Sequence, residues 1–471
     1  TELCEKSHFN FLPQLKTYLE TEKEEDPETG LEVVNLPYPG NTTYNFNKRI
    51  TDKDIQPISI AYMTSVSHIL VLDLSYNILT DKGASVLSKL LEYAENIKKI
   101  NLKGNKITDN GCESLNKGII SKKKLEYLNL NSNTFGNVGL LSINELLFKN
   151  ESLKFLDVGG NRYDWDGIIS LMNALKTTNK SLEVLNMDDP AYKISDQHFF
   201  NHVGKMFLSN TSVRKLSLKF NRMRWEGLNI IIFSLVRNTT LTVLDLTGNQ
   251  ICFQGMIYVR DYLKNNNILK SLILCGNKLR DQGAKVLVDG LVENKTLVHL
   301  DITNNDIGER GFIDFGNKIK ENQGIKSLKL FRDNHWEKTE KNDKHEKTNE
   351  AIEIFNEYLK IKGDDFYPDF TVYEDAEELN IAYLETHIPN EIEYNSSSCI
   401  NWKCKNGHKY SCEIVGRTLF NLGCPKCNPE NDILPVNTKY GCLTIVDNFN
   451  AYQHEIAANK IFLKNLKNTI F

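Results

Sequence analysis

A sequence unit that recurs about every 28 residues constrains this chain more than any other feature. Residues 69–334 repeat the pattern L-x-x-L-x-L-x-x-N-x-[IL]-x-x-x-G, beginning with ILVLDLSYNILTDKG (69–83) and IKKINLKGNKITDNG (97–111). A fixed period of this length is typical of repeat architectures, so we expect a solenoid instead of a single globular core. The repeated asparagine, which we call the ladder asparagine, is followed six residues later by glycine and occurs as Asn77, Asn105, Asn133, Asn161, Asn221, Asn249, Asn277 and Asn305.

Each unit predicts a short strand, a loop, a helix and a second loop. The apolar strand residues are expected to face the interior, and the ladder asparagine to hydrogen-bond the backbone of adjoining coils. The segment that the glycine opens, such as GASVLSKLLEYA (83–94), has apolar residues at helical spacing. The unit resembles the leucine-rich repeat of the ribonuclease-inhibitor type. This resemblance implies an α/β solenoid, a horseshoe with parallel strands on the concave face and helices outside.

One unit departs from the pattern. In LEVLNMDDP (182–190) Pro190 stands where the other units have the ladder asparagine, and the next strand, VRKLSL (213–218), begins 31 residues after Leu182. We predict that this is the least regular unit of the stack. The extra residues are interpreted as a surface insertion.

The remaining sequence suggests five segments. Residues 1–49 are expected to cap the solenoid with a helix (9–20), an acidic turn-rich loop (21–30) and a first strand (31–36). Residues 50–334 hold a half-repeat (50–68) and ten strands, and residues 335–390 a charged extension, a capping helix (350–360) and a linker. Residues 391–430 form a zinc-binding module and 431–471 a tail. The ten strands are expected to begin near Ile69, Ile97, Leu125, Leu153, Leu182, Val213, Leu241, Leu269, Leu297 and Ile325.

Composition and short motifs narrow the function. The net charge of −4 argues against general binding of polyanions, and no apolar run approaches the roughly 20 residues of a membrane span. The opening residues lack the apolar segment of a signal peptide, so we expect a reducing, cytoplasmic environment. The N-x-[ST] matches at Asn150, Asn210, Asn238 and Asn294 fall mostly in one recurring turn, and we interpret them as turn residues instead of glycosylation sites.

A cluster near the C-terminus has the spacing of a metal site. Cys404 and His408 are separated by 15 residues from Cys424 and Cys427. Three thiolates and one imidazole can close a tetrahedral zinc site, which leaves no open position for catalysis, so we expect structural Zn²⁺. Cys412 or Cys399 could replace His408 as the fourth ligand.

The same segment resembles a widespread zinc-ribbon or treble-clef family of probable zinc modules. The resemblance rests on the zinc ligands together with Trp402, Gly407, Tyr410, Arg417 and Pro425. Five basic residues make the module mildly basic, and its contact with nucleic acid is kept as the alternative function. These residues are Lys403, Lys405, Lys409, Arg417 and Lys426.

Partner-binding residues are predicted from the side chains between the strand leucines, which face the concave side, and from two tryptophans on the rim. Charges of both signs are mixed on this face, which suits a protein partner better than nucleic acid. The alternatives are that many of these residues are simply solvated and that the tryptophans pack on neighbouring loops. The candidates are Tyr127, Phe155, Lys215, Lys219, Phe220 and His299 on the strands, with Trp165 and Trp225 on the rim.

No catalytic motif is present: GxxxxGK[ST], G-x-S-x-G and HExxH are all missing from the sequence, and His299 is interpreted as paired with Asp301. We therefore expect a protein that is not an enzyme.

Residues 50–388 are similar to the leucine-rich repeat-containing protein 34 family. The similarity rests on ITDKDIQPI (50–58), on the irregular unit DDPAYKISDQHFFNHVGKMFLSNTSVRKLSL (188–218) and on FYPDFTVYEDAEELNIAYL (366–384). It implies a non-enzymatic intracellular scaffold within a larger assembly, in the cilium or axoneme, with the nucleolus as the alternative location.

Overall fold

The computed structural model describes residues 23–25, 32–41, 49–64, 69–190, 197–330, 399–403 and 409–413. The chain divides into two compact units, Thr1–Pro368 and Asp369–Phe471. In the described part of the first unit, an eleven-stranded sheet follows the order of the sequence from β3 (Leu36–Pro37) to β13 (Ser327–Lys329). Each strand pairs in parallel with its neighbours, for example Val243 with Ser271 and Leu244 with Leu272.

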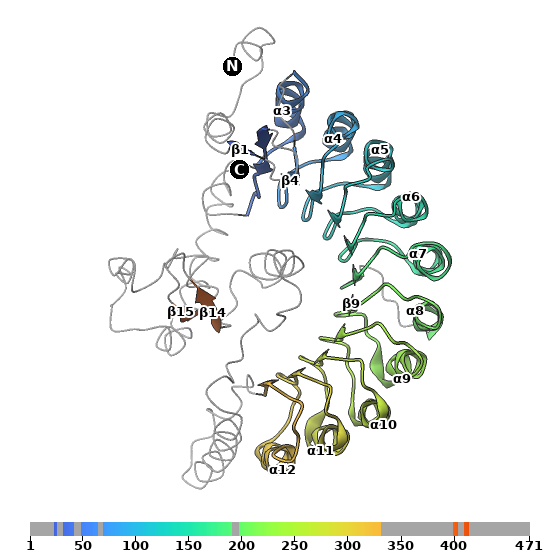
Figure 1. Ribbon diagram of the computed structural model, residues 1–471, viewed down its shortest axis with the longest axis vertical. Coiled ribbons are helices and arrows are strands. Elements are labelled where there is room, and N and C mark those ends of the chain that lie inside the picture. Colours follow the sequence, from blue (N-terminus) through green and yellow to red (C-terminus); the bar gives the residue numbers. More distant parts are fainter. Residues whose placement is uncertain are drawn as a thin grey trace, which may run out of the picture. The chain divides into compact units, whose positions relative to one another are not determined.

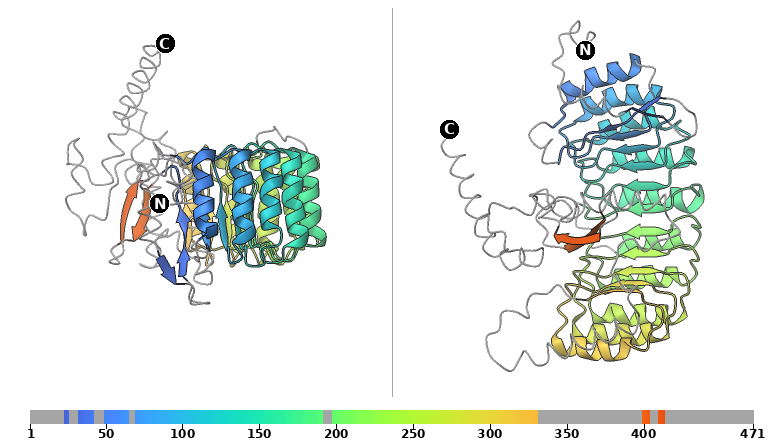
Figure 2. Two further views of the ribbon diagram at one scale, coloured as in Figure 1. Left: turned by 90° about the horizontal axis from the view of Figure 1, so that it is seen from above. Right: turned by 60° about the vertical axis from the view of Figure 1, so that its left-hand side comes forward.

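Strands and helices alternate as the repeat predicts. Figure 1 shows the strands on the inner side of the arc and the helices on its outer side. From the side, the helices form one layer beside the sheet (Figure 2). The intervening strands are β4 (Val71–Asp73), β5 (Lys99–Asn101), β6 (Tyr127–Asn129), β7 (Phe155–Asp157), β8 (Val184–Asn186), β9 (Lys215–Ser217), β10 (Val243–Asp245), β11 (Ser271–Ile273) and β12 (His299–Asp301). The helices are α3 (Asp52–Thr64), α4 (Asp81–Tyr93), α5 (Asp109–Ile119), α6 (Asn137–Lys149), α7 (Trp165–Thr177), α8 (Gln197–Phe207), α9 (Arg224–Leu235), α10 (Phe253–Asn265), α11 (Arg280–Glu293) and α12 (Glu309–Ile319).

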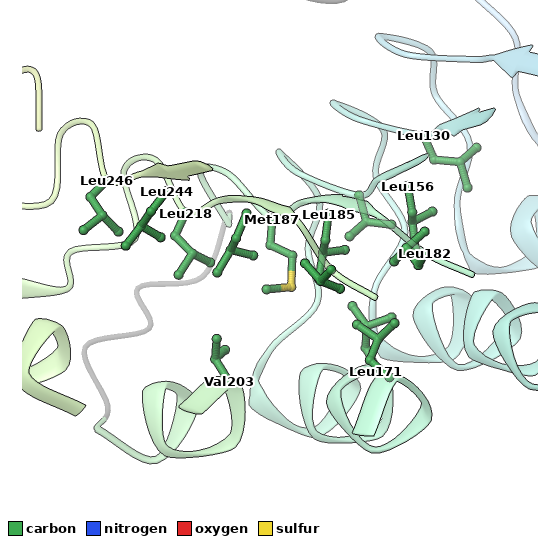
Figure 3. Packing of buried hydrophobic residues seen from close by; sticks show 14 of the residues in the cluster. Leu130, Leu156, Leu171, Leu182, Leu185, Met187, Val203, Leu218, Leu244 and Leu246 are labelled. Atoms are coloured by element: carbon green, nitrogen blue, oxygen red, sulfur yellow. The ribbon is translucent and has the colours of Figure 1, made fainter. Parts of the chain in front are cut away.

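Aliphatic side chains fill the space between the sheet and the helices. Figure 3 shows Leu156, Leu185 and Leu244 on successive parts of the sheet, above Leu171 of α7 and Val203 of α8. All five are fully buried. Burial of one such side chain stabilises the fold by roughly 1.5–3 kcal/mol. Because these contacts extend from each repeat to the next, the stack is stable where a single repeat would not be.

The ladder asparagines connect each repeat to the preceding one. The Asn105 amide Nδ2 donates to the Leu74 carbonyl at 2.9 Å, and its Oδ1 accepts from the Leu79 backbone N–H at 3.0 Å. Asn133 does the same with Leu102 and Ile107. The expected contact with adjoining coils is therefore confirmed, and its direction is toward the N-terminus.

The glycine of the repeat makes room for a carboxylate. Asp109 Oδ1 accepts from the backbone N–H groups of Gly136 and Gly139 at 2.7 Å each, at the start of α6. A Cβ on Gly139 would lie 2.9 Å from the same oxygen. The aspartate thus caps the next helix, and the helix begins at Asn137, two residues before the glycine that was expected to open it.

The recurring turn asparagines are structural. Asn150 is buried, its Nδ2 donates to the Lys122 carbonyl at 2.7 Å, and its Oδ1 accepts from the Leu153 N–H at 2.8 Å. Asn238 bonds Phe207 and Leu241 in the same way. Turn chemistry therefore accounts for these N-x-[ST] matches, as expected.

The irregular unit keeps its place in the sheet. Val184 pairs with Lys215 and Leu185 with Leu216, so the extra residues between β8 and β9 do not shift the register. The buried Oδ1 of Asn221 has no hydrogen-bond partner, and the same is true of Asn161 in a regular repeat. That this unit is the least regular therefore stays a prediction.

The N-terminal segment differs from the expectation in two respects. The single strand expected at 31–36 is split into β2 (Glu32–Val34) and β3, and Asn35 between them accepts from the Val71 N–H through its Oδ1 at 3.0 Å. Part of the expected acidic loop is β1 (Lys23–Glu25), which pairs antiparallel with β2. The turn-favouring sequence DPETG at 26–30 separates the two strands.

Several predictions fall outside the described residues: the helices at 9–20 and 350–360, the charged extension and the tail. Within the described residues, no helix is both long and apolar enough to cross a bilayer.

Candidate protein-interaction site

The residue before each ladder position has a left-handed backbone throughout the described repeats. Glycine adopts this conformation without steric cost, whereas a bulky side chain costs roughly 1–2 kcal/mol. Four of these positions are glycines, but two carry aromatic rings, at Tyr76 and Phe220. The full set, with φ between 41° and 69°, is Tyr76, Gly104, Ser132, Gly160, Asp189, Phe220, Gly248, Gly276 and Asn304.

Phe220 is exposed in this unfavourable conformation. Its φ is 57° and its side chain is 52% exposed. The ring lies against Gly248, where a Cβ would be 2.2 Å from Phe220 Cδ1. Its backbone N–H donates to the Thr247 carbonyl at 2.8 Å, which holds the loop on the next repeat. The ring is therefore fixed in position while half of it faces solvent.

Two arginines extend the strained segment. Arg222 and Arg224 have φ values of 51° and 53°, and both side chains are exposed. Met223 between them is buried, and its N–H donates to Asn249 Oδ1 at 3.2 Å. Within the part of the chain that the structure describes, neither guanidinium makes an ion pair. The left-handed backbone at these two positions recurs in other repeats, at Gln250, Asp306 and Arg280, so it belongs to the fold.

Trp225 follows on the same loop, at the start of α9. Its ring is half-buried and stacks on Tyr258 of α10, with 6.4 Å between the ring centroids and 7° between the planes. It packs on the neighbouring helix, whereas the alternative considered from the sequence was packing on a neighbouring loop. Trp165 begins α7, and its side chain lies outside the described residues. We call Phe220, Arg222, Arg224 and Trp225 the Phe220 site.

The predicted lysines beside this site have internal partners. Lys219 Nζ lies 3.8 Å from Asp188 Oδ2 and 3.5 Å from Asp245 Oδ2. Burial lowers the pKa of Lys215, and the charge of Glu183 partly opposes this effect. Much of the charge on Lys219 is thus balanced within the sheet, so the exposed cations beside Phe220 are Arg222 and Arg224.

The other concave-face candidates are less accessible. The rings of Tyr127 and Phe155 stack with centroids 4.2 Å apart, and they are only 5% and 4% exposed. Lys99 Nζ lies 4.9 Å from the Tyr127 centroid, a cation–π contact. The alternation of residues predicts which face these rings occupy, but it does not reveal that neighbouring rings cover one another.

His299 pairs differently from the expectation. Its Nδ1 lies 2.8 Å from Ser327 Oγ on β13, whereas Asp301 Oδ1 accepts from Thr303. Asp301 Oδ2 lies 3.9 Å from Lys329 Nζ. Residues two apart on one strand share a face, but the cross-strand neighbour is closer. Burial, with a smaller contribution from Lys329, lowers the pKa of His299 to about 4.

The predicted zinc ligands Cys404, His408, Cys424 and Cys427 lie outside the described residues, but two described strands frame the first pair. β14 (Cys399–Lys403) and β15 (Lys409–Glu413) are antiparallel, with Lys403 opposite Lys409. In the sequence, Cys404 directly follows β14 and His408 directly precedes β15. Their role as zinc ligands stays a prediction.

The alternative ligands lie at the other end of the hairpin. Cys399 is opposite Glu413 and Cys412 is opposite Ile400. Since a strand rises about 3.3 Å per residue, these positions are roughly 10–13 Å from the Lys403–Lys409 pair. The choice of His408 as the fourth ligand stays a prediction.

Comparisons with known proteins agree with this architecture. A leucine-rich repeat family matches residues 67–88, 93–115, 121–143, 237–256 and 293–315, and a family described as a probable treble clef zinc finger domain matches residues 379–430. The chain thus contains a leucine-rich repeat solenoid and a treble-clef zinc finger domain. Such repeats point to a protein-interaction module.

Solved structures with detectable similarity include two domains. The tropomodulin C-terminal domain of Caenorhabditis elegans is 13% identical, covers 41% of this chain and 96% of its own, and has a TM-score of 0.26. Leiomodin-1 actin-binding site 2 is 14% identical, covers 42% of this chain and 88% of its own, and has a TM-score of 0.25. No curated protein matched the sequence.

Proposed function

We propose that this protein is a non-enzymatic scaffold and that its Phe220 site binds a protein partner. The observation that carries the proposal is the exposed ring of Phe220 at a left-handed position where four other repeats have glycine. Glycine would remove the strain and would lose only the half of the ring that packs on Gly248. Because strained residues cluster at functional sites, the exposed half of the ring supports partner binding.

The chemistry of the site indicates the kind of surface that it binds. Aromatic and arginine side chains dominate the energetic centres of protein interfaces. Phe220 offers an apolar face, and Arg222 and Arg224 offer two exposed guanidinium groups that can pair with carboxylates. The partner surface should therefore place an apolar side chain next to two or more acidic residues.

We further propose that the scaffold acts in the cytoplasm as part of a ciliary or axonemal assembly. The support is the similarity of residues 50–388 to the leucine-rich repeat-containing protein 34 family, above all in the irregular unit beside the Phe220 site. The nucleolus is the alternative location.

The zinc module has a structural role in this proposal. Cys404, His408, Cys424 and Cys427 hold one Zn²⁺, whose binding free energy folds a segment with few large apolar residues.

The alternative function is nucleic-acid binding through the same module, which Lys403, Lys405 and Lys409 on and beside the hairpin favour. The alternative predicts an affinity that falls steeply with salt. If nucleic-acid binding is absent, or does not change with salt, this alternative function is ruled out.

Cross-linking and mass spectrometry of the native protein from ciliated-cell extract tests the proposal. Cross-links from Lys215 and Lys219, which precede the Phe220 site in the sequence, to axonemal proteins are the expected result, and they would identify the partner. Lys99 reports on the rest of the concave face. If cross-links are confined to Lys403, Lys405 and Lys409 and RNA-associated proteins are recovered, the zinc module and not the repeat solenoid is the part that binds the partner.

A further inference from the structure

Helix α9 has apolar residues on all sides. Leu228, Ile231 and Leu235 are fully buried against the core. On the outer side, Phe233 is 77% exposed, and Val236, the residue after the helix, is 63% exposed. A helix on the surface of a globular protein normally has polar residues on its outer face, so this helix departs from the pattern.

Helix α8 lies beside it and supplies a basic edge. The two helices approach closely, since a Cβ on Gly204 of α8 would lie 2.4 Å from Ser234 Oγ of α9. Figure 1 shows α8 and α9 as neighbours on the outer side of the arc. Lys205 precedes Phe233 by one 28-residue step, and Leu208, which is 55% exposed, precedes Val236 by the same step. Equivalent positions on adjacent repeats therefore place a lysine beside the phenylalanine.

The charges near α8 are of one sign. The pKa of His202 is lowered by burial first, and then by the positive charges of Lys205, His198 and Lys176. Lys176 and Lys205 are exposed and, within the described residues, form no ion pair. On the opposite side, the exposed Asp261 of α10 is paired with Arg260 at 2.7 Å, and Arg237, the residue after Val236, adds an exposed positive charge.

We propose that the outer face of α8 and α9, defined by Lys205, Leu208, Phe233 and Val236, is a second docking surface, and that it takes an acidic amphipathic helix of a partner protein. Phe233 and Val236 are three residues apart and project side by side, as anchors for a helix lying along α9. The partner's carboxylates would meet Lys205 and Lys176 on the α8 side. The surface is formed by outer residues near the end of α9 and is separate from the Phe220 site, which ends in the first turn of α9, so the two sites can serve different partners.

The charge distribution favours a helix over an anionic membrane. A membrane surface attracts a protein through cations distributed around the apolar residues. Here, among the described residues, only three exposed cations, Lys176, Lys205 and Arg237, lie near the apolar residues, fewer than the roughly 4–8 of a lipid-binding cluster, which favours a partner helix with one acidic side. Complementary charge of this kind fixes the orientation of the partner.

Peptide binding by the full-length protein tests the proposal. The probes are two fluorescent helical peptides with the same leucine face, one with glutamates and the other with lysines along its edge, followed by anisotropy. The glutamate peptide is expected to bind at least about tenfold more tightly, and Phe233→Glu to weaken it by at least about tenfold. Phe148→Glu is the matched control, because Phe148 is 46% exposed on α6 and, like Val236, lies two residues before a turn asparagine.

Three outcomes would overturn the proposal. One is equal binding of the two peptides, or binding that Phe233→Glu leaves unchanged. Another is sedimentation with phosphatidylserine vesicles that Phe233→Glu abolishes, which would assign the face to a membrane. The third is a dimer in sedimentation velocity that the same substitution dissociates, which would assign it to a second copy. Phe220→Gly should leave peptide binding intact, which separates this proposal from the function of the Phe220 site.

Discussion

The ring of Phe220 lies over Gly248, the residue at the same position of the next repeat. Both residues have a left-handed backbone, with φ of 57° and 69°. The glycine avoids the steric cost and also leaves space for the neighbouring ring. The same relationship occurs once more, where Tyr76 lies against Gly104. An aromatic residue at this position therefore depends on a glycine in the following repeat.

Two substitutions of Phe220 should distinguish the energetic cost of its left-handed backbone from the contribution of its ring to packing. Phe220→Gly removes the left-handed penalty and loses a ring that is only half-buried, so the free energy of unfolding should stay the same or rise by up to about 1 kcal/mol. Phe220→Val should lower it by about 1–2 kcal/mol, because a β-branched side chain tolerates positive φ poorly. Urea unfolding followed by circular dichroism measures both. A strongly destabilised glycine variant would mean that the ring itself stabilises the fold.

The ladder asparagines should differ in their contributions. Asn105→Ala leaves the Leu74 carbonyl and the Leu79 N–H without their side-chain partner, at a cost of roughly 2–4 kcal/mol. Asn221→Ala should cost about 1 kcal/mol less, because the buried Oδ1 of Asn221 already lacks a partner. Chemical unfolding of the two variants side by side measures the difference. Equal losses would contradict the smaller contribution of Asn221.

His299 should make the repeats less stable in acid. Its pKa is about 4 in the folded protein, against 6.5 ordinarily, so the folded state holds fewer protons than the unfolded chain between these values. Stability is therefore complete above pH 6.5 and declines as the pH falls toward 4, by about 1–3 kcal/mol. Unfolding at pH 7.5 and pH 5 checks this, with His299→Gln as the control. The same pH slope in the variant would show that other groups are responsible.

The zinc content of cysteine and histidine variants should identify the zinc ligands. Native mass spectrometry should find one zinc ion per chain, lost in Cys427→Ser and in His408→Ala because each removes a ligand. Cys412→Ser should retain the metal, since Cys412 is opposite Ile400, away from the loop. Zinc lost from the Cys412 variant and retained by the His408 variant would reverse the assignment.

The repeat pattern predicted alternating strands and helices and the asparagine ladder, because strand, helix and ladder position all lie within one 28-residue unit, and the resemblance to leucine-rich repeats implied the parallel sheet and the outer helices. The repeat pattern could not explain why glycine stands six residues after the ladder asparagine. The neighbour of this glycine is an aspartate of the preceding repeat, as Asp109 is for Gly139, and only the stacking of coils brings the two together.

The candidate site was predicted in part. Phe220 and Trp225 were identified from their positions, and the glycines at 104, 160, 248 and 276 already mark the left-handed column that contains Phe220. Accessibility was not predictable, because Tyr127 and Phe155 occupy the expected face but cover each other. The exposed apolar side of α9 was also missed, although four consecutive apolar residues, IIIF (230–233), depart from the helical spacing of apolar and polar residues expected of an outer helix.

The central claim is tested most directly by comparing how much of the cross-linked partner is recovered with the Phe220→Gly and Tyr76→Gly variants. Isotope-labelled mass spectrometry quantifies the recovery. Both variants replace an aromatic ring at the same left-handed position over a glycine, but in different repeats. We predict that Phe220→Gly lowers recovery of the partner by at least about tenfold and that Tyr76→Gly leaves it unchanged. Equal recovery with both variants would contradict binding at the Phe220 site.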